Sequence, residues 1–146
     1  FGLRGILVEE GSLTKRAPSK KEWEDIRYGW EVAQEIGRLD IGQCVVVKNR
    51  VVVAVEAVEG TDEAIRRGGA LARDGAVVVK RSKPQQDLRF DLPAVGPTTV
   101  EAMSSVKASV LALEADRCVL LDREEMLRKA EQAGIAIVGL PRDANR

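Results

Sequence analysis

The sequence of 146 residues contains no histidine, and this absence excludes several kinds of active site. Without an imidazole the chain cannot build a Ser-His-Asp triad, a Cys-His dyad, the common zinc ligand sets or histidine ligation of haem. Acid–base chemistry must therefore use Asp, Glu, Lys, Tyr or water. Any metal site must be built on oxygen ligands, which favours Mg²⁺, Ca²⁺ or Mn²⁺.

Two further shortages argue against nucleic-acid recognition. Lys and Arg together number 23, and so do Asp and Glu, so there is no excess of positive charge. Aromatic residues make up only 3% of the chain, which leaves few side chains on which bases stack. Because nucleic-acid binders normally carry a basic excess, we expect no nucleic-acid partner.

Cysteines and long apolar runs are also scarce. Cys44 and Cys118 lie in apolar, strand-like runs and form no CxxC motif, so we expect buried free thiols and a reducing compartment. No apolar run approaches the roughly 18–20 residues of a membrane span, and no signal peptide is visible. The chain begins with Phe1 rather than Met, which suggests a fragment of a longer protein.

What remains is the composition of an ordinary globular domain. The chain is 45% hydrophobic, and its length suits one domain, since single domains usually have about 100–150 residues. Helical and strand-like segments alternate along it. This pattern predicts an α/β fold, a single compact domain with a mixed β-sheet flanked by helices.

The clearest helix signal covers residues 19–37. Ser19 and Glu22 have the spacing of a capping box, in which each side chain accepts a hydrogen bond from the backbone amide of the other residue. Apolar residues then follow at intervals of three and four, which is one face of an amphipathic helix. They are Trp23, Ile26, Trp30, Ala33 and Ile36.

Two β-branched runs, 44–47 and 51–55, predict a hairpin, because Asn49 between them tolerates a positive φ. Their nearly continuous apolar character predicts burial on both faces. The next expected elements are a helix over 61–73 with Thr61 as N-cap, a strand over 76–80 and a loop over 81–97 that contains one short extended piece. They are followed by a helix from 97 to 106, a second hairpin of 110–113 and 118–121, a helix over 123–133 capped by Asp122 with Glu125 at the capping-box position, and a strand over 135–138.

The order hairpin, helix, strand is expected twice, in residues 44–80 and again in residues 109–139. One interpretation is a weak internal duplication of a ββαβ unit. The other is that α/β domains commonly have this order, since the identity between the two segments is low. Both predict a mixed sheet flanked by helices.

Three carboxylates, Glu56, Glu59 and Asp62, cluster at the end of a predicted strand and the start of a helix. The free amides and positive dipole end of a helix suit phosphate, and carboxylates there suit a divalent cation. The structural alternative is that Thr61 and Asp62 only cap the helix and that Glu56 is solvated. The spacing alone slightly favours that alternative.

A second cluster of charged residues lies between residues 80 and 91, where four cations stand against two carboxylates for a net charge of +2. Cations bind phosphate oxygens, while a carboxylate holds a metal ion or positions water. A solvated loop rarely places Phe90 and Leu92 among such groups, so a functional loop is favoured. The charged residues are Lys80, Arg81, Lys83, Asp87, Arg89 and Asp91.

Long motifs in and around these clusters resemble a known family. They are GSLTKRAP (11–18), LDIGQCVVV (39–47), AVEAVEGTDEAIRR (54–67), VVVKRSKPQQDLRFDLPAVGPTT (77–99) and LALEADRCVLLDRE (111–124). Over nearly its whole length the chain resembles the carboxy-terminal domain of the LpxI-type UDP-2,3-diacylglucosamine pyrophosphatases of lipid A biosynthesis in Gram-negative bacteria. That family also has an amino-terminal domain. The resemblance therefore implies that residues 1–146 are the catalytic carboxy-terminal domain of a two-domain enzyme, with residues 1–18 as a lead-in segment.

The resemblance also implies an activity and a set of site residues. Family members hydrolyse UDP-2,3-diacylglucosamine to UMP and 2,3-diacylglucosamine 1-phosphate (lipid X) with a divalent metal, usually taken as Mg²⁺. By motif position the essential carboxylate is Asp87, with Asp91 as second choice. The expected metal ligands are Asp87, Glu59, Asp91 and Asp62, and the expected substrate-binding residues are Lys80, Lys83, Gln86, Arg89, Thr61, Thr98 and Thr99.

The expected partners follow from that activity. They are the lipid-linked sugar nucleotide, the missing amino-terminal domain, a second copy in a homodimer and a peripheral contact with the inner membrane from the cytoplasm. We expect the isolated chain to turn over slowly or not at all. The alternative function is a non-catalytic domain that binds a nucleotide sugar or phospholipid, or supports a catalytic partner, and metal-dependent turnover distinguishes the two.

Overall fold

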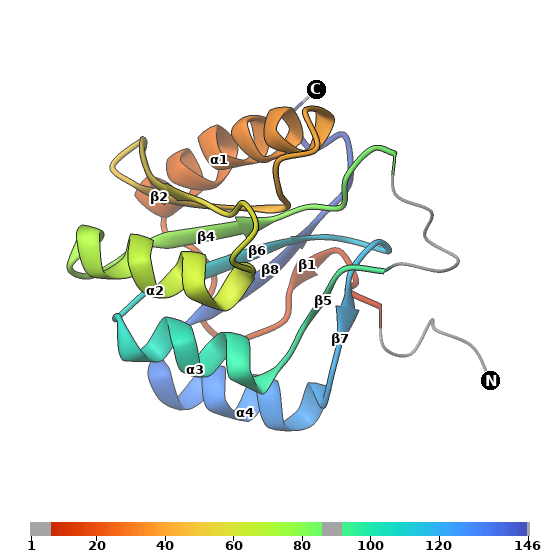
Figure 1. The fold of residues 1–146 in the computed structure, drawn as a ribbon. Helices are drawn as coiled ribbons and strands as arrows, with labels where there is room; N and C mark the ends of the chain where they lie inside the picture. Colours follow the sequence, from red (N-terminus) through yellow and green to blue (C-terminus); the bar gives the residue numbers. More distant parts are fainter. Residues whose placement is uncertain (1–6, 86–91, 146) are drawn as a thin grey trace.

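A six-stranded mixed sheet lies at the centre of the molecule, with one helix on one face and three on the other (Figure 1). The structure is a computed structural model that describes residues 7–85 and 92–145. The strand order is β1-β8-β6-β4-β2-β3, and β5 and β7 form a separate two-stranded sheet. The predicted fold class, a single α/β domain with a mixed sheet flanked by helices, is confirmed.

The elements follow one another in the order expected of an α/β domain. The strands are β1 (Gly11–Ser12), β2 (Cys44–Lys48), β3 (Val51–Val55), β4 (Val77–Lys80), β5 (Ala94–Val95), β6 (Val110–Glu114), β7 (Val119–Leu120) and β8 (Ala136–Leu140). The helices are α1 (Lys20–Arg38), α2 (Thr61–Ala72), α3 (Pro97–Ser105) and α4 (Arg123–Ala133).

Four strands of the main sheet end at one edge, which we call the carboxyl edge. β4, β6 and β8 are parallel, and β3 runs the same way because β2 is antiparallel to both β3 and β4. Helices α2, α3 and α4 also begin on this side (Figure 1), where α2 follows β3, α3 follows β5 and α4 follows β7. Ligands of open α/β sheets bind at the carboxyl ends of the strands, so this edge is where a site is expected.

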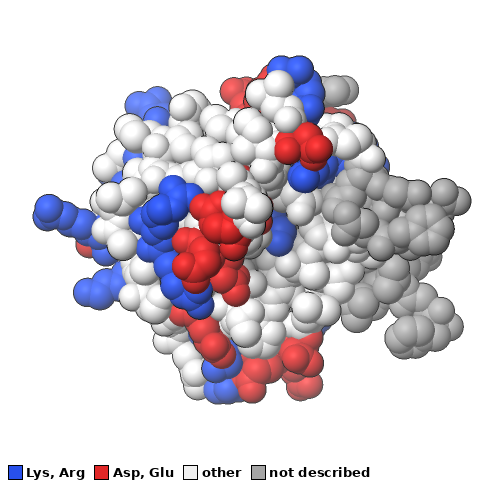
Figure 2. Space-filling view, in the orientation of Figure 1, with Lys and Arg blue, Asp and Glu red and all other residues white. Residues whose placement is uncertain are grey.

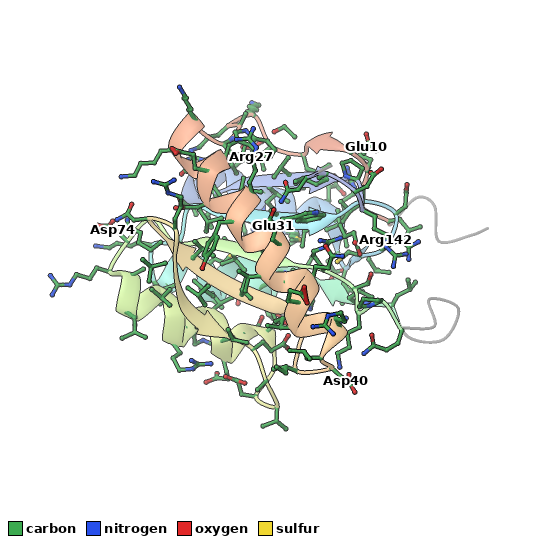
Figure 3. The ribbon with its side chains drawn as sticks, turned by 90° about the horizontal axis from the view of Figure 1, so that it is seen from above. Glu10, Arg27, Glu31, Asp40, Asp74 and Arg142 are labelled. Atoms are coloured by element: carbon green, nitrogen blue, oxygen red, sulfur yellow. The ribbon has the colours of Figure 1, made fainter. Side chains whose placement is uncertain are left out.

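The sheet separates two apolar clusters. Side chains alternate between the faces of a strand, so Val47 packs with Ile26 and Trp30 of α1, while Val46 packs on the face covered by α2, α3 and α4. Figure 3 shows α1 crossing the first face. Gly68 lets α2 approach closely, because a Cβ there would lie 2.7 Å from the Cβ of Val46. The capping box at the start of α1 is present as predicted.

The first predicted hairpin is confirmed, and a buried carboxylate holds its turn. Asn49 and Arg50 both have positive φ, at 52° and 59°, and the Asp25 carboxylate accepts both of their backbone N–H groups at 3.1 and 2.7 Å. The prediction of burial on both faces holds for β2 but is wrong for β3. That strand lies at the sheet edge, where Val51 is 58% exposed.

The second predicted hairpin is wrong. All five residues of β6 are buried, and β6 pairs with β4 on one side and β8 on the other, so it has no free edge for β7. β7 instead pairs in parallel with β5, outside the main sheet. The ββ pairing is therefore not repeated among the described strands, and the interpretation as a ββαβ duplication loses its second hairpin.

Two predicted helix caps also differ in detail. The N-cap of α2 is Gly60, not Thr61, and Thr61 is the first helical residue. Asp122 occupies the N-cap of α4 as predicted, but its side chain makes no capping hydrogen bond. Glu125 pairs instead with Arg128 one turn along the helix. The Thr61 hydroxyl and the Asp122 carboxylate therefore make no capping bond to their helices.

The described part of the predicted lead-in segment, residues 7–18, is attached to the domain. β1 pairs with β8, Val8 is fully buried, and the Thr14 hydroxyl accepts the backbone N–H of Ile137 at 3.1 Å. Within residues 7–85 and 92–145, the helices are too short or too polar to cross a bilayer.

Candidate functional site

A cleft of about 510 Å³ lies at the carboxyl edge, where α2 and α3 begin. Three segments line it, residues 59–63, 94–99 and 121–122, and we call it the carboxyl-edge cleft. The first-turn N–H groups of a helix have no partner within the helix, and the helix dipole is positive there. Because two helices begin in its lining, the cleft suits an anion.

Lys80 lies beside this cleft and is only 7% exposed. Its Nζ donates to Thr61 Oγ1 and to the carbonyl oxygen of Ala94, both at 3.0 Å, and these two residues line the cleft. The Thr61 hydroxyl donates to Glu56 Oε2 at 3.2 Å, and Glu56 Oε1 accepts the backbone N–H of Gln43 at 2.9 Å. Glu56 is therefore buried and bonded, and the alternative that it is solvated is wrong.

Glu59 lies in the loop that leads into α2, and its carboxylate contacts both that loop and the helix. Hydrogen bonds from the backbone N–H groups of Ala57 and of Glu59 itself, and then the Arg67 guanidinium, lower the pKa of Glu59 to about 2. The carboxylate is thus ionised at neutral pH and is paired with Arg67. Gly60 follows with a φ of +93°, which side-chain-bearing residues rarely adopt, and this accounts for the glycine of the EGTD motif.

Charges of both signs lie along α2. Acidic side chains gather where the helix begins, and basic ones follow further along it (Figure 2). The acidic residues are Glu59, Asp62 and Glu63, and the basic ones are Arg66 and Arg67, which pair with Glu63 and Glu59. A polyanion in the cleft would therefore approach carboxylates as well as helix amides.

The other predicted residues of the cleft lie in the first turn of α3. Thr98 is exposed and lines the cleft. Thr99 is buried, with 4% exposed, and its hydroxyl accepts the backbone N–H of Gly96 at 3.2 Å. Pro97, the first helical residue, has no N–H of its own to satisfy. The exposed hydroxyl of this turn is therefore that of Thr98.

Lys83 lies away from the cleft lining. Its ammonium group bonds to Asp40, which follows α1, at 2.8 Å, and this bond and charge lower the pKa of Asp40. The structure therefore brings Lys80, Glu59, Thr61, Asp62, Thr98 and Thr99 together and places Lys83 on a neighbouring contact. The predicted residues Gln86, Asp87, Arg89 and Asp91 lie outside the described residues.

A buried ion pair fixes the start of the loop that follows β4. Arg81 is 4% exposed and Glu114, the last residue of β6, is 1% exposed, and they bond at 3.0 Å. Glu114 also accepts the backbone N–H and the hydroxyl of Ser82. Arg81 stacks on the Trp30 ring, 4.2 Å from its centroid, and donates to the Arg142 carbonyl at 2.7 Å.

Sequence reasoning treated Glu56 as one of three clustered carboxylates or as a solvated residue, gave Arg81 only a general role and assigned none to Glu114. The sequence feature that could have pointed to Glu56 and Glu114 is a single charged residue directly after an apolar strand. Glu56 follows the run Val51–Val55, and Glu114 ends the run Val110–Leu113. Because a charge is costly to bury without partners, such a residue marks either the surface or a buried hydrogen-bond network. The sequence alone does not distinguish the two.

The described carboxylates do not make a metal site by themselves. Over residues 7–85 and 92–145, no three side chains of His, Cys, Asp or Glu come together as a set of ligands. Glu59 is already engaged with Arg67, and Glu56 with Thr61 and a backbone amide. The two remaining predicted ligands, Asp87 and Asp91, lie outside the described residues.

Comparison with known families decides the relationship. Residues 9–138 match the family described as the LpxI C-terminal domain. The chain belongs to this family. The predicted resemblance to LpxI-type proteins is thereby confirmed.

Two curated proteins are similar to this chain in sequence. The chain is 38% identical over 143 residues to the UDP-2,3-diacylglucosamine pyrophosphatase LpxI of Caulobacter vibrioides, covering 92% of this chain and 51% of that protein. It is 31% identical over 130 residues to the bifunctional purine biosynthesis protein PurH of Bacillus subtilis, covering 86% of this chain and 22% of PurH. The chain thus spans about half of the LpxI relative.

Proposed function

We propose that the protein carrying this chain hydrolyses the pyrophosphate of UDP-2,3-diacylglucosamine to UMP and lipid X in lipid A biosynthesis. Membership of the LpxI C-terminal domain family and 38% identity to a curated pyrophosphatase support the substrate. The structural observation that carries the proposal is the buried ammonium of Lys80 beside a cleft where two helices begin. These are groups that bind phosphate oxygens.

In the proposed reaction, the oxygen of a water molecule bonds to one phosphorus and the bridging P–O bond breaks, so that one phosphate leaves. The proton that this water loses passes to the solvent, and we propose that Asp87 orients the water. Lys80, the first-turn amides of α2 and α3, and Thr98 bind the phosphate oxygens. Lys83, Gln86 and Arg89, which follow β4 in the sequence, extend this set, and Thr61 and Thr99 support it.

We propose Mg²⁺ as the cofactor, with Asp87 as its first ligand and Asp91 as its second. The ion supplies charge neutralisation for the pyrophosphate. The acidic start of α2 gives an electrostatic reason, since a polyanion meets the carboxylates of Glu59 and Asp62 there. Both remain candidate ligands, although Glu59 would have to exchange Arg67 for the metal.

The test is release of UMP from UDP-2,3-diacylglucosamine by the full-length protein. We expect turnover that stops with EDTA and returns with Mg²⁺. Binding of the nucleotide lipid without turnover would contradict the proposal and favour a non-catalytic binding module. Turnover that persists in EDTA would contradict the metal requirement alone. We expect the 146-residue chain by itself to turn over slowly or not at all, since it spans about half of its LpxI relative.

A lipid substrate also implies contacts beyond the cleft. We propose that the protein works in the cytoplasm, touches the inner membrane peripherally, and joins this chain to an amino-terminal domain in a protein that forms homodimers. Three large apolar side chains near the carboxyl edge support the membrane contact: Leu39, Ile41 and Val58 are 58%, 44% and 100% exposed. Sedimentation with lipid vesicles and the mass in solution test these proposals. A monomer that stays with the supernatant would contradict both.

A further inference from the structure

The two oxygens of the Glu56 carboxylate accept hydrogen bonds from different segments of the chain. Oε1 accepts the backbone N–H of Gln43 at 2.9 Å, and Oε2 accepts the Thr61 hydroxyl at 3.2 Å. Gly42 lies so close that a Cβ there would be 2.0 Å from the Glu56 carbonyl oxygen. Over the described residues, no lysine or arginine pairs with Glu56. Its contact towards the cleft is therefore Thr61.

The hydroxyl of Thr61 has one proton, so it can donate to only one of its two partners, Glu56 and Lys80. An ionised carboxylate only accepts hydrogen bonds, so the Thr61 proton points to Glu56. The oxygen lone pairs then remain for Lys80, whose ammonium only donates and lies at 3.0 Å. A hydroxyl turned the other way would place its proton against the ammonium of Lys80.

The ammonium of Lys80 keeps a donor for an anion. It has three N–H groups, and its acceptors among the described residues are the neutral Thr61 hydroxyl and the Ala94 carbonyl. The ammonium lies in a nearly water-free position, where its interaction with a phosphate is stronger than in bulk water. Because Thr61 and Ala94 line the cleft, the third N–H, which has no acceptor among the described residues, lies beside the cleft.

We propose that Glu56 is a positioning residue that acts through Thr61 to hold the Lys80 ammonium towards the phosphate of the bound substrate. This inference rests on the proposed function, since it takes the pyrophosphate of a nucleotide lipid as the anion that Lys80 binds. Glu56 itself touches neither the substrate nor the metal in this arrangement. Its effect is transmitted by one hydroxyl group.

The substitution Glu56→Gln tests this directly, because an amide of the same shape cannot make both bonds. With its oxygen towards Gln43, its NH₂ group faces the Thr61 hydroxyl, which then can no longer donate to residue 56. With its oxygen towards Thr61, its NH₂ group meets the backbone N–H of Gln43. Either orientation loses one of the two hydrogen bonds that the Glu56 carboxylate accepts.

The kinetic experiment compares full-length variants on UDP-2,3-diacylglucosamine. We expect Glu56→Gln and Thr61→Val each to lower kcat/KM by about 10-fold, as expected when a hydrogen bond to a charged group is lost. Thr61→Ser keeps the hydroxyl and should restore most of the activity. The double variant Glu56→Gln/Thr61→Val should be no slower than either single variant, because both act through one contact. The control Glu125→Gln changes an exposed carboxylate on α4 and should match the wild type.

A second readout does not depend on turnover. In ¹⁵N spectra of the lysine ammonium groups, the Lys80 signal should be slowed in exchange by its hydrogen bonds, and Lys80→Arg assigns it by removing it. The signal should persist in Thr61→Ser and Glu125→Gln and be lost in Glu56→Gln and Thr61→Val. An inactive wild type would contradict the proposed function, while these spectra would still decide the inference. An unchanged Lys80 signal in Glu56→Gln, wild-type activity in that variant, or a double variant about 100-fold slower than wild type would overturn it.

Discussion

At the scale of single residues, Arg81 and Glu114 are two buried charges that compensate each other. Burial lowers the pKa of the Arg81 guanidinium, and the nearby Glu114 carboxylate opposes that effect. Both side chains are almost fully buried and share bonds with Ser82, Trp30 and Arg142. The pair therefore joins α1, β6 and the start of the loop after β4.

Replacing Glu114 by Ala should lower the free energy of unfolding by about 3–5 kcal/mol, because Arg81 is left buried without its counter-charge. Urea unfolding measures this. The matched control is Glu125→Ala, which removes an exposed carboxylate paired with Arg128 and should cost no more than about 0.5 kcal/mol. Equal effects in the two variants would contradict the compensating role of Glu114.

The two thiols give a prediction about alkaline pH. Burial raises the pKa of Cys44 to about 12 and that of Cys118 to about 11, from an ordinary value of 9.0. The folded state thus keeps protons that the unfolded chain releases above pH 9, so the stability is complete below pH 9 and falls as the pH rises towards 11–12.

At pH 10 this linkage should cost about 1 kcal/mol for each thiol. We expect urea unfolding at pH 8 and pH 10 to show a smaller fall in stability for the Cys44→Ala/Cys118→Ala variant than for the wild type. Both thiols should resist iodoacetamide at pH 8 until the protein is denatured. Rapid labelling of the native protein would contradict the burial of these groups.

Residue types predicted much of the site but not its connections. The EGTD motif led correctly to a helix start, and its Thr61 does line the cleft. The hydroxyl does not cap the helix, because Glu56 and Lys80 occupy it. The contact between Thr61 and Lys80 joins residues that are 19 positions apart in the sequence. Spacing along the chain cannot reveal it without the sheet order.

At the scale of whole elements, the hairpin of β2 and β3 depends on a residue from another element. Asp25 of α1 accepts the N–H groups of Asn49 and Arg50 in the turn. Both residues have positive φ, and Arg50 does not share the tolerance of Asn49 for that region. The carboxylate therefore stabilises a turn that local preference alone leaves weak.

Replacing Asp25 by Ala should lower the free energy of unfolding by about 1–3 kcal/mol, since two backbone donors lose a charged acceptor. Hydrogen exchange of the Asn49 and Arg50 amides should speed up in the same variant. The control Asp74→Ala removes an exposed carboxylate that pairs with Lys48 nearby, and it should leave both amides unchanged. Unchanged exchange in Asp25→Ala would contradict the role of this contact.

Prediction from the sequence succeeded for local elements and failed for strand partners. α1 follows from a capping box and a periodic apolar face, and both signals lie within one segment. β6 and β7 follow each other closely, as hairpin strands do, but β6 is taken on both sides by β4 and β8. Which strands pair depends on burying the whole apolar length of β6, and the local pattern does not contain that information.

At the scale of the whole molecule, the balanced charge conceals an uneven distribution. The net charge is zero, yet Lys80 is buried beside a cleft while carboxylates gather where α2 begins. Because this chain has no histidine, its own proton-transfer groups are Asp, Glu, Lys, Tyr and bound water. The fold places Lys80, Glu59, Thr61, Asp62, Thr98 and Thr99 at the carboxyl edge, and Asp87 follows β4 in the sequence.

The central claim is that this edge hydrolyses a pyrophosphate with the help of Asp87, and kcat of the full-length Asp87→Ala variant on UDP-2,3-diacylglucosamine tests it most directly. We predict a loss of at least about 100-fold, as expected when a residue that positions the attacking water is removed. The matched control is Asp74→Ala, at the opposite edge of the sheet from Asp40 and Arg142 (Figure 3), which should retain wild-type kcat. A wild-type kcat in Asp87→Ala would contradict the account.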